Sequence, residues 1–227
     1  MTPPRSRIEW RPGYRIVSSR FPPIGVFDDI ASPADIDALF ELEGRTNPRI
    51  REQLGQIQLI PAERRVSGPG TTPVMAAFTH LNRDGSRFSN GSFGVYYAAQ
   101  DRDTAVAETV FHRARFLAYT REPRSILEMR CYLSDIAADL HDVRGGYAGL
   151  HDPDNYAESQ RTALELRAAG SNGLVYDSVR RPGGQCVALF YPDLVASTRQ
   201  SAHLYYHWNG HEMTHVVVAD EVIVLAS

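Results

Sequence analysis

The sequence predicts an α+β fold, with a compact β-sheet core and surrounding helices. Three observations favour the class. Short β-rich segments outnumber helical ones, they do not alternate regularly with helices as in a doubly wound sheet, and two β-rich runs flank Asn209-Gly210, a strong hairpin signal. The 227 residues, 43% hydrophobic and 22% charged, suffice for a hydrophobic core.

The first part of the chain is expected to be an N-terminal helical extension, residues 1–65, that packs on a main domain of residues 66–227. Ser32-Pro33 predicts a helix start, because Ser caps helices well and Pro suits the first helical position. A second helix is expected after Asn47-Pro48. The loop-rich stretch 67–73 (SGPGTTP) marks the boundary between the two parts.

The main domain shows the periodicities of both helices and strands. Asn155 and Glu158 resemble a capping box, and the helix that they open is expected to end near Gly170. The remaining expected elements are a helix over 103–118, strands over 94–99, 125–133, 174–179 and 185–191, and the hairpin around Asn209-Gly210.

Composition excludes several classes of protein. The net charge of -3 argues against a general nucleic-acid binder, and the absence of lysine excludes lysine-based catalysis. Cys131 and Cys186 lie in apolar stretches and are expected to be buried, reduced thiols. With neither a signal peptide nor an apolar run of the roughly 18 residues that span a membrane, a cytoplasmic protein without a membrane partner is expected.

The helix expected over 103–118 has one apolar face and one polar face. Glu108, His112 and Arg115 project together on the polar face. Such a stripe is most often the solvated side of a surface helix, and it is alternatively one wall of a cleft. His112 lies one turn from Glu108, where it either holds that carboxylate in place or packs the helix.

The segment before this helix favours the cleft. A polar turn that begins with Arg87 leads into the strand that carries Tyr96 and Tyr97, whose rings must point to opposite faces. Tyr97 and Arg87 are therefore expected to converge with Glu108 at one end of a turn–strand–helix unit. Far downstream, Ser178 and Arg180 follow a strand, in a position typical of either a solvated turn or a binding site.

Two separated motifs resemble the RES domain family, which is named for its Arg, Glu and Ser. They are SRFSNGSFGVYYAAQDRDTAVAETVFH (86–112) and GSNGLVYDSVRRPGGQCVALF (170–190). Arg87, Glu108 and Ser178 match the three naming residues, and Tyr97 matches the aromatic position before Ala-Ala.

The resemblance implies a fold similar to ADP-ribosyltransferases and a toxin of a toxin–antitoxin pair. Such toxins cleave the nicotinamide–ribose bond of NAD⁺ and pass ADP-ribose to phosphate or water, or transfer it to a protein. NAD⁺ would be a substrate, no metal is expected, and the partner would be an Xre-like antitoxin that blocks the site.

The chemistry suits the matched residues. A carboxylate, Glu108, would stabilise the oxocarbenium-like state of the ribose. Arg87 would bind the pyrophosphate through its planar fork of donors, and Tyr97 would stack on nicotinamide. Ser178 would bind a ribose or phosphate oxygen, and Arg180 is a second candidate for contact with an anion.

Two rival interpretations remain. His211-Glu212-Met213-Thr214-His215 has the HExxH pattern of zinc metalloproteases, but that pattern requires a helix, and strand-like residues follow it here. On a strand, side chains four residues apart are about 13 Å apart, too far to share one zinc ion. The other rival is a non-catalytic binding module, which the joint presence of Arg87, Glu108 and Ser178 disfavours.

Overall fold

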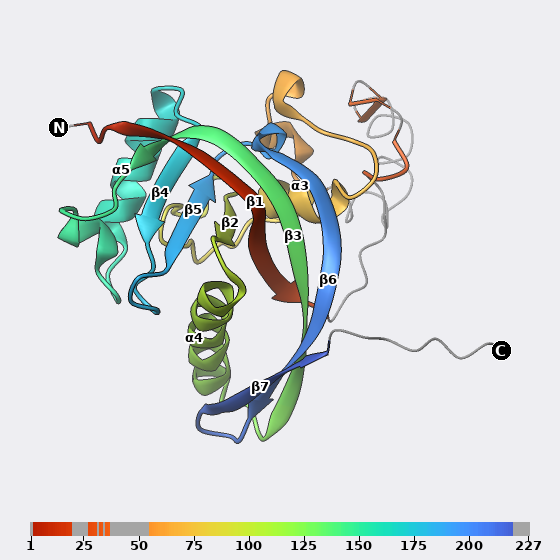
Figure 1. Ribbon diagram of the computed structural model, residues 1–227, viewed down its shortest axis with the longest axis vertical. Coiled ribbons are helices and arrows are strands. Elements are labelled where there is room, and N and C mark those ends of the chain that lie inside the picture. Colours follow the sequence, from red (N-terminus) through yellow and green to blue (C-terminus); the bar gives the residue numbers. More distant parts are fainter. Residues whose placement is uncertain (1, 20–26, 31, 34, 37–54, 220–227) are drawn as a thin grey trace.

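The computed structural model describes residues 2–19, 27–30, 32–33, 35–36 and 55–219, and Figure 1 shows its arrangement. Strands and helices are interspersed along the chain. In order they are β1 (Arg5–Ser18), the 3₁₀ turns η1 (Ile57–Leu59) and η2 (Ala62–Arg64), α3 (Thr72–Thr79), β2 (Tyr96–Ala99), α4 (Arg102–Thr120), β3 (Ser125–Asp142), η3 (Ala148–His151), α5 (Ala157–Ala168), β4 (Gly173–Asp177), β5 (Gln185–Leu189), η4 (Pro192–Leu194), β6 (Val195–Trp208) and β7 (Met213–Ala219).

The strands form one seven-stranded sheet in the order β1-β2-β5-β4-β3-β6-β7. All pairs are antiparallel except β3–β4, which is parallel. Because β1 pairs with both β2 and β3, five of the strands close into a ring, and β6 and β7 continue beyond it. The long strands β1, β3 and β6 curve around the molecule (Figure 1). The predicted α+β class is confirmed.

The prediction of a purely helical N-terminal extension is wrong for β1. This strand pairs with β3 from Arg5 opposite His141 to Ser18 opposite Met129, so it is an integral part of the sheet. Its partner lies more than a hundred residues away, which local sequence patterns cannot reveal. Residues 35–36 are helical, as expected, but most of the first predicted helix and the start of the second lie outside the described residues.

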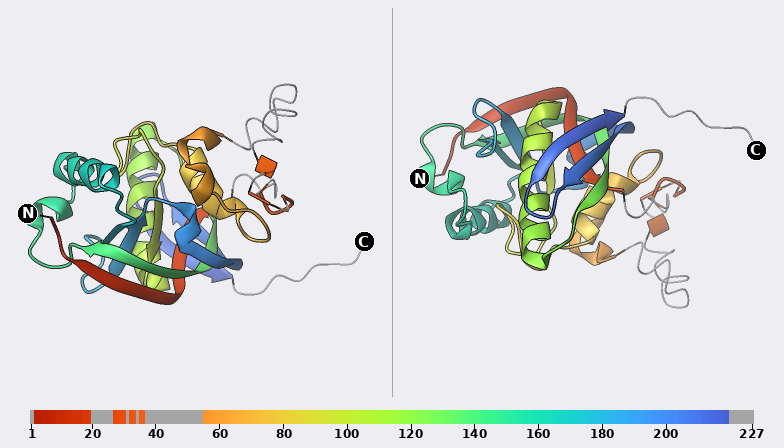
Figure 2. Two further views of the ribbon diagram at one scale, coloured as in Figure 1. Left: turned by 90° about the horizontal axis from the view of Figure 1, so that it is seen from above. Right: turned by 90° about the horizontal axis from the view of Figure 1, so that it is seen from below.

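Side chains on the two faces of the sheet enter two separate cores. Tyr96 and Ala98 of β2 join the core cluster that contains Phe78 of α3, whereas Ala99 joins the cluster that contains Ala105 of α4. The alternation along β2 follows from the two-residue repeat of a strand. Figure 1 shows α3 and α4 as separate helices beside the sheet, and Figure 2 shows the same arrangement from above and below.

Helix α4 is fixed at both ends. Asp101 caps its start: one carboxylate oxygen accepts the Thr104 amide at 2.8 Å, and Arg181 donates to the same oxygen at 3.1 Å. Arg121 ends the helix in the left-handed conformation, with φ of 52°. Helix α5 begins one residue later than a cap at Asn155 predicts, and Asn155 accepts the Ala157 amide instead of forming the predicted capping box with Glu158.

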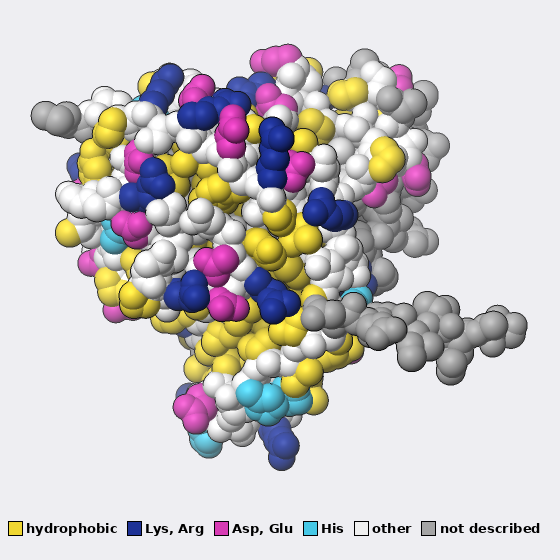
Figure 3. Space-filling model, in the orientation of Figure 1, with side chains coloured by type: hydrophobic (Ala, Val, Ile, Leu, Met, Phe, Trp, Pro, Cys, Tyr) yellow, Lys and Arg dark blue, Asp and Glu magenta, His cyan; other side chains and the backbone are white. Residues whose placement is uncertain are grey.

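The predicted C-terminal hairpin is confirmed as β6–β7. His211 and Glu212 lie in its turn, and His215 lies on β7 opposite His207, with the two rings stacked 4.1 Å apart. The HExxH pattern therefore does not lie on a helix, as zinc proteases require. Figure 3 shows histidines gathered at this end of the molecule. In the described part of the chain, no helix has the length and apolar character needed to cross a membrane.

Candidate functional site

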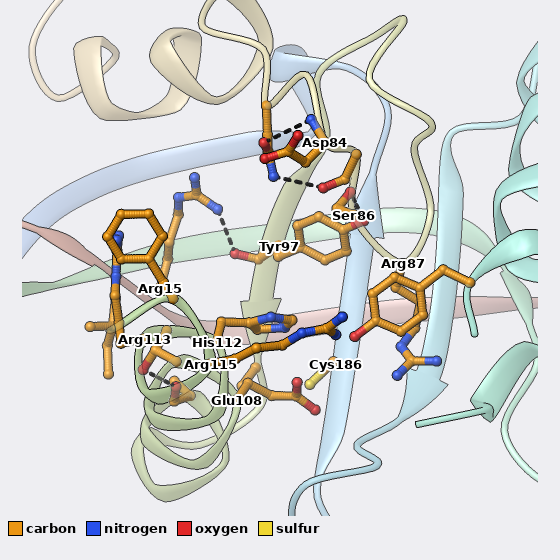
Figure 4. A pocket seen from close by; sticks show the side chains of 18 of the residues that line it. Arg15, Asp84, Ser86, Arg87, Tyr97, Glu108, His112, Arg113, Arg115 and Cys186 are labelled. Atoms are coloured by element: carbon orange, nitrogen blue, oxygen red, sulfur yellow. Dashed lines mark hydrogen bonds between the residues drawn. The ribbon is translucent and has the colours of Figure 1, made fainter. Parts of the chain in front are cut away.

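A cavity of about 1210 Å³ opens beside α4, where β1, β2, the 82–87 segment and the start of α5 meet. Figure 4 shows its side chains. Of the residues singled out in the sequence, Arg87, Tyr97, Glu108, His112 and Arg115 line it. Its volume exceeds that of most small-ligand pockets, so it can hold a ligand of several linked groups.

Glu108 is held by Ser178. The Ser178 hydroxyl donates to a Glu108 carboxylate oxygen at 2.6 Å and accepts the amides of Arg180 and Arg181, each at 3.1 Å. The two amides fix the direction of the hydroxyl, because only its proton remains for the carboxylate. The structure thus joins two of the motif residues, and Ser178 contacts Glu108 rather than lining the cavity itself.

The turn that carries Ser178 is packed closely on the start of α4. A side chain at Gly184 would lie 2.5 Å from the Thr104 hydroxyl, and the Ser178 amide donates to the Gly184 carbonyl at 2.8 Å. Glycine is therefore required at this point for close approach. The contact sets the distance between Ser178 and the helix that carries Glu108.

Arg87 is buried, with 6% of its surface exposed, in the wall opposite α4. One terminal nitrogen donates to the carbonyls of Leu150 and Asp152, at 3.1 and 2.7 Å, and the guanidinium lies 4.6 Å from the centre of the Tyr156 ring. These contacts hold one side of the guanidinium in place at the cavity wall. Among the described residues no carboxylate forms a salt bridge with Arg87, and a buried arginine of this kind favours an anionic ligand.

The two tyrosines of β2 point to opposite faces, as predicted. Tyr96 is buried and hydrogen-bonds Ser134 at 2.9 Å, whereas Tyr97 lines the cavity. The Tyr97 hydroxyl lies 2.8 Å from the Ser86 hydroxyl and accepts the Phe88 amide at 2.9 Å. Burial raises the pKa of Tyr97 to about 12, so the phenol is neutral at physiological pH. Its hydroxyl fixes the turn on both sides of Arg87.

Arg15 is a candidate residue that the sequence did not indicate. It extends from β1 into the cavity, donates to the Tyr97 carbonyl at 3.0 Å, and lies 4.6 Å from the centre of the Tyr96 ring. Its Nε is buried and has no hydrogen-bond partner among the described residues, and burial lowers the pKa of Arg15. Arg15 and Arg87 lie on opposite sides of Tyr97 (Figure 4). Arg15 was not predicted as a site residue because β1 was expected to belong to a helical extension.

His112 projects from α4 into the cavity (Figure 4). Although the ring is accessible from the cavity, desolvation by the surrounding protein and then the charges of Arg180 and Arg87 lower its pKa to about 4. The ring is therefore neutral at pH 7 and carries one donor and one acceptor nitrogen.

We expect the His112 ring signals to titrate in NMR with a midpoint near 4. Between pH 4 and pH 6.5 the His112 ring then binds fewer protons in the folded protein than in the unfolded chain. The contribution of His112 to the free energy of unfolding is therefore full above pH 6.5 and is lost as the pH falls towards 4. Arg180→Gln should raise the midpoint, because a nearby positive charge is removed. A midpoint of 6.5 or above in the native protein would contradict this environment.

Arg180 is not among the residues that line the cavity. Its guanidinium covers the Phe111 ring, 3.2 Å from the ring centre, and it donates to the Pro153 carbonyl. The side chain thus connects α4 to the 150s loop behind the cavity wall. Contact between Arg180 and a ligand anion, expected from the sequence, would require the side chain to leave these contacts.

No group of three or more His, Cys, Asp or Glu side chains suited to a metal ion occurs within the described residues. Cys131 and Cys186 are both buried, as expected, and neither forms a disulfide within the described residues. Cys186 lines the floor of the cavity, where burial raises its pKa, so the thiol stays protonated.

Comparison with known proteins identifies the family of the chain. The profile of the RES domain matches residues 62–209. The chain belongs to the RES domain family. Arg87, Glu108 and Ser178, which the motif resemblance singled out, all lie within the matched segment.

Two further comparisons cover nearly the whole chain. The uncharacterized protein y4oC of Sinorhizobium fredii (strain NBRC 101917 / NGR234) is 31% identical over 210 residues, which are 92% of this chain and 87% of that protein. A chain of the crystal structure of the M. tuberculosis MbcT–MbcA toxin–antitoxin complex aligns with 93% of this chain and 86% of its own length, at 13% identity and a TM-score of 0.46.

Proposed function

We propose that this RES domain protein cleaves the nicotinamide–ribose bond of NAD⁺ and passes the ADP-ribose to phosphate or water. The observation that carries the proposal is the pairing of Glu108 with Ser178 beside a large cavity that Arg87 and Tyr97 also line. A carboxylate held in one orientation is what the cleavage of an N-glycosidic bond requires, because positive charge develops on the ribose.

Each side chain has a role in this reaction. The free lone pairs of Glu108 accept hydrogen bonds from the ribose hydroxyls and stabilise the oxocarbenium-like state. Nicotinamide leaves as a neutral ring with the electron pair of the broken C–N bond, so no strong acid is needed. The neutral Tyr97 ring offers a stacking surface for nicotinamide, and Arg87 and Arg15 offer guanidiniums to the phosphates. Ser178 acts as a positioning residue.

The family resemblance supports a proposal for the partner and the setting. RES domain toxins are paired with Xre-like antitoxins, and we propose that such an antitoxin blocks the cavity of this chain in the cytoplasm, where the toxin would otherwise deplete NAD⁺. Expression of the wild-type chain alone should then stop growth.

The test is a time course of NAD⁺ with the purified protein, followed by NMR or mass spectrometry with and without phosphate. Production of ADP-ribose 1″-phosphate only when phosphate is present identifies a phosphorylase, and free ADP-ribose identifies a hydrolase. If NAD⁺ is consumed only after cell lysate is added, the acceptor is a protein. NAD⁺ that stays intact even then would overturn the proposal and favour a binding module.

Ser178→Ala should lower kcat for NAD⁺ cleavage by about 10- to 100-fold, because a hydrogen bond to a charged group is lost and Glu108 is no longer held. Ser178→Thr, which keeps the hydroxyl, should restore much of the rate. KM should change little in either variant, because the hydroxyl does not line the cavity. An unchanged kcat in Ser178→Ala would show that Glu108 is positioned by other contacts.

A further inference from the structure

Tyr119 combines two properties that rarely occur together. It is the most exposed of the large hydrophobic side chains in the described part of the chain, at 88%, and it lines the same cavity as Glu108. Phe116, 56% exposed, lies one turn earlier and also lines the cavity. Exposed aromatic rings at the mouth of a cavity indicate a ligand that covers them.

Tyr119 ends a straight stripe along α4. Glu108, His112, Arg115 and Tyr119 are spaced by four, three and four residues, which places them on one line of the helix surface, and all four line the cavity. Figure 4 shows the first three extending from α4 on the same side. At 1.5 Å per residue, the stripe from carboxylate to phenol is about 16 Å long.

The chemistry changes along the stripe in the order of the groups in a dinucleotide. A carboxylate comes first, a guanidinium follows seven residues later, and an aromatic ring is at the end. Within the described residues, no carboxylate pairs with Arg115, so its charge is available to a phosphate. His112, between them, is neutral and adds no further positive charge.

We propose that this stripe sets the direction in which the dinucleotide lies: the reacting ribose at Glu108, the diphosphate at Arg115, and the adenine ring stacked on Tyr119. The assignment rests on the proposed function, because it takes Glu108 as the residue next to the broken bond. Stacking on an aromatic side chain is worth enough to bind a base without hydrogen bonds to its edges.

Binding of ADP tests the proposal without turnover. In the Glu108→Gln protein, calorimetry should detect ADP binding, and a second change of Tyr119→Ala should weaken it by about 5- to 100-fold. Arg115→Gln should weaken it by a factor of about ten or more. Tyr119→Phe should retain the affinity, because the ring remains. Arg121→Gln, an equal loss of charge just beyond the helix and outside the cavity, is the matched control and should have no effect.

Nicotinamide mononucleotide is the second probe, because it lacks the adenosine part of the dinucleotide. Its affinity should not change in Tyr119→Ala. Loss of its binding instead of ADP binding would reverse the orientation, and ADP binding that is absent, or unaffected by Tyr119→Ala, would equally overturn the proposal. These results are separable from the proposed function: cleavage of NAD⁺ by the wild type could stand while the stripe fails, and ADP binding could depend on Tyr119 in a protein that does not cleave NAD⁺.

Discussion

Glu108→Gln should reduce kcat/KM for NAD⁺ cleavage by about 10³-fold while the protein stays folded. Removing one group that stabilises charge in a transition state typically costs a factor of this size. The Gln side chain has nearly the same shape and keeps an oxygen that can accept the Ser178 hydroxyl, which donates to Glu108 at 2.6 Å. What it loses is the negative charge beside the ribose.

The measurement is the rate of product formation, together with thermal unfolding to confirm that the melting temperature is nearly unchanged. Glu165→Gln, the same substitution at an exposed position of α5, is the matched control and should have wild-type kcat/KM. In cells, the Glu108→Gln chain should no longer stop growth. If the variant kept a rate within tenfold of that of the wild type, Glu108 would have no direct role in cleaving the bond.

Arg87→Ala should lower both activity and stability. The carbonyls of Leu150 and Asp152 lose the nitrogen that donates to them, which costs about 1–3 kcal/mol for each acceptor that stays buried. The cavity also loses a guanidinium that offers donors to a phosphate, so kcat/KM for NAD⁺ should fall by about 10²-fold or more.

Arg87→Lys separates the two effects. An ammonium can still donate to the two carbonyls, so most of the stability should return, but it cannot offer the planar fork, and kcat/KM should stay at least about tenfold below that of the wild type. Urea unfolding and NAD⁺ kinetics measure the two quantities. Arg161→Ala, at an exposed position of α5, is the control. Full activity of Arg87→Lys would mean that Arg87 is structural only.

Local periodicity was sufficient to predict α4 and β2. The apolar and polar sides of α4 repeat within a few residues, and a strand places Tyr96 and Tyr97 on opposite faces wherever it lies in the sheet. Both features depend only on neighbouring residues. The hairpin at Asn209-Gly210 was predictable for the same reason, because its turn residues and both strands are contiguous.

Long-range pairing could not be predicted in this way. β1 was assigned to a helical extension because nothing near residues 5–18 indicates that β3 lies beside them. Arg15 was missed as a direct consequence. Arg180 was expected to face a ligand, but its direction depends on where Phe111 and the Pro153 carbonyl come to lie, and these belong to other elements.

The sequence by itself determined the α+β class, the elements that carry the motif residues, and the identity of Arg87, Glu108 and Ser178, because these depend on composition, short-range repeats and motif order. Only the tertiary structure decided that the Ser178 hydroxyl donates to Glu108, that Arg15 shares the cavity, and that Tyr119 lines its mouth. Each of these is a contact or a shared surface between elements far apart in the chain, and such relations exist only after the sheet has closed.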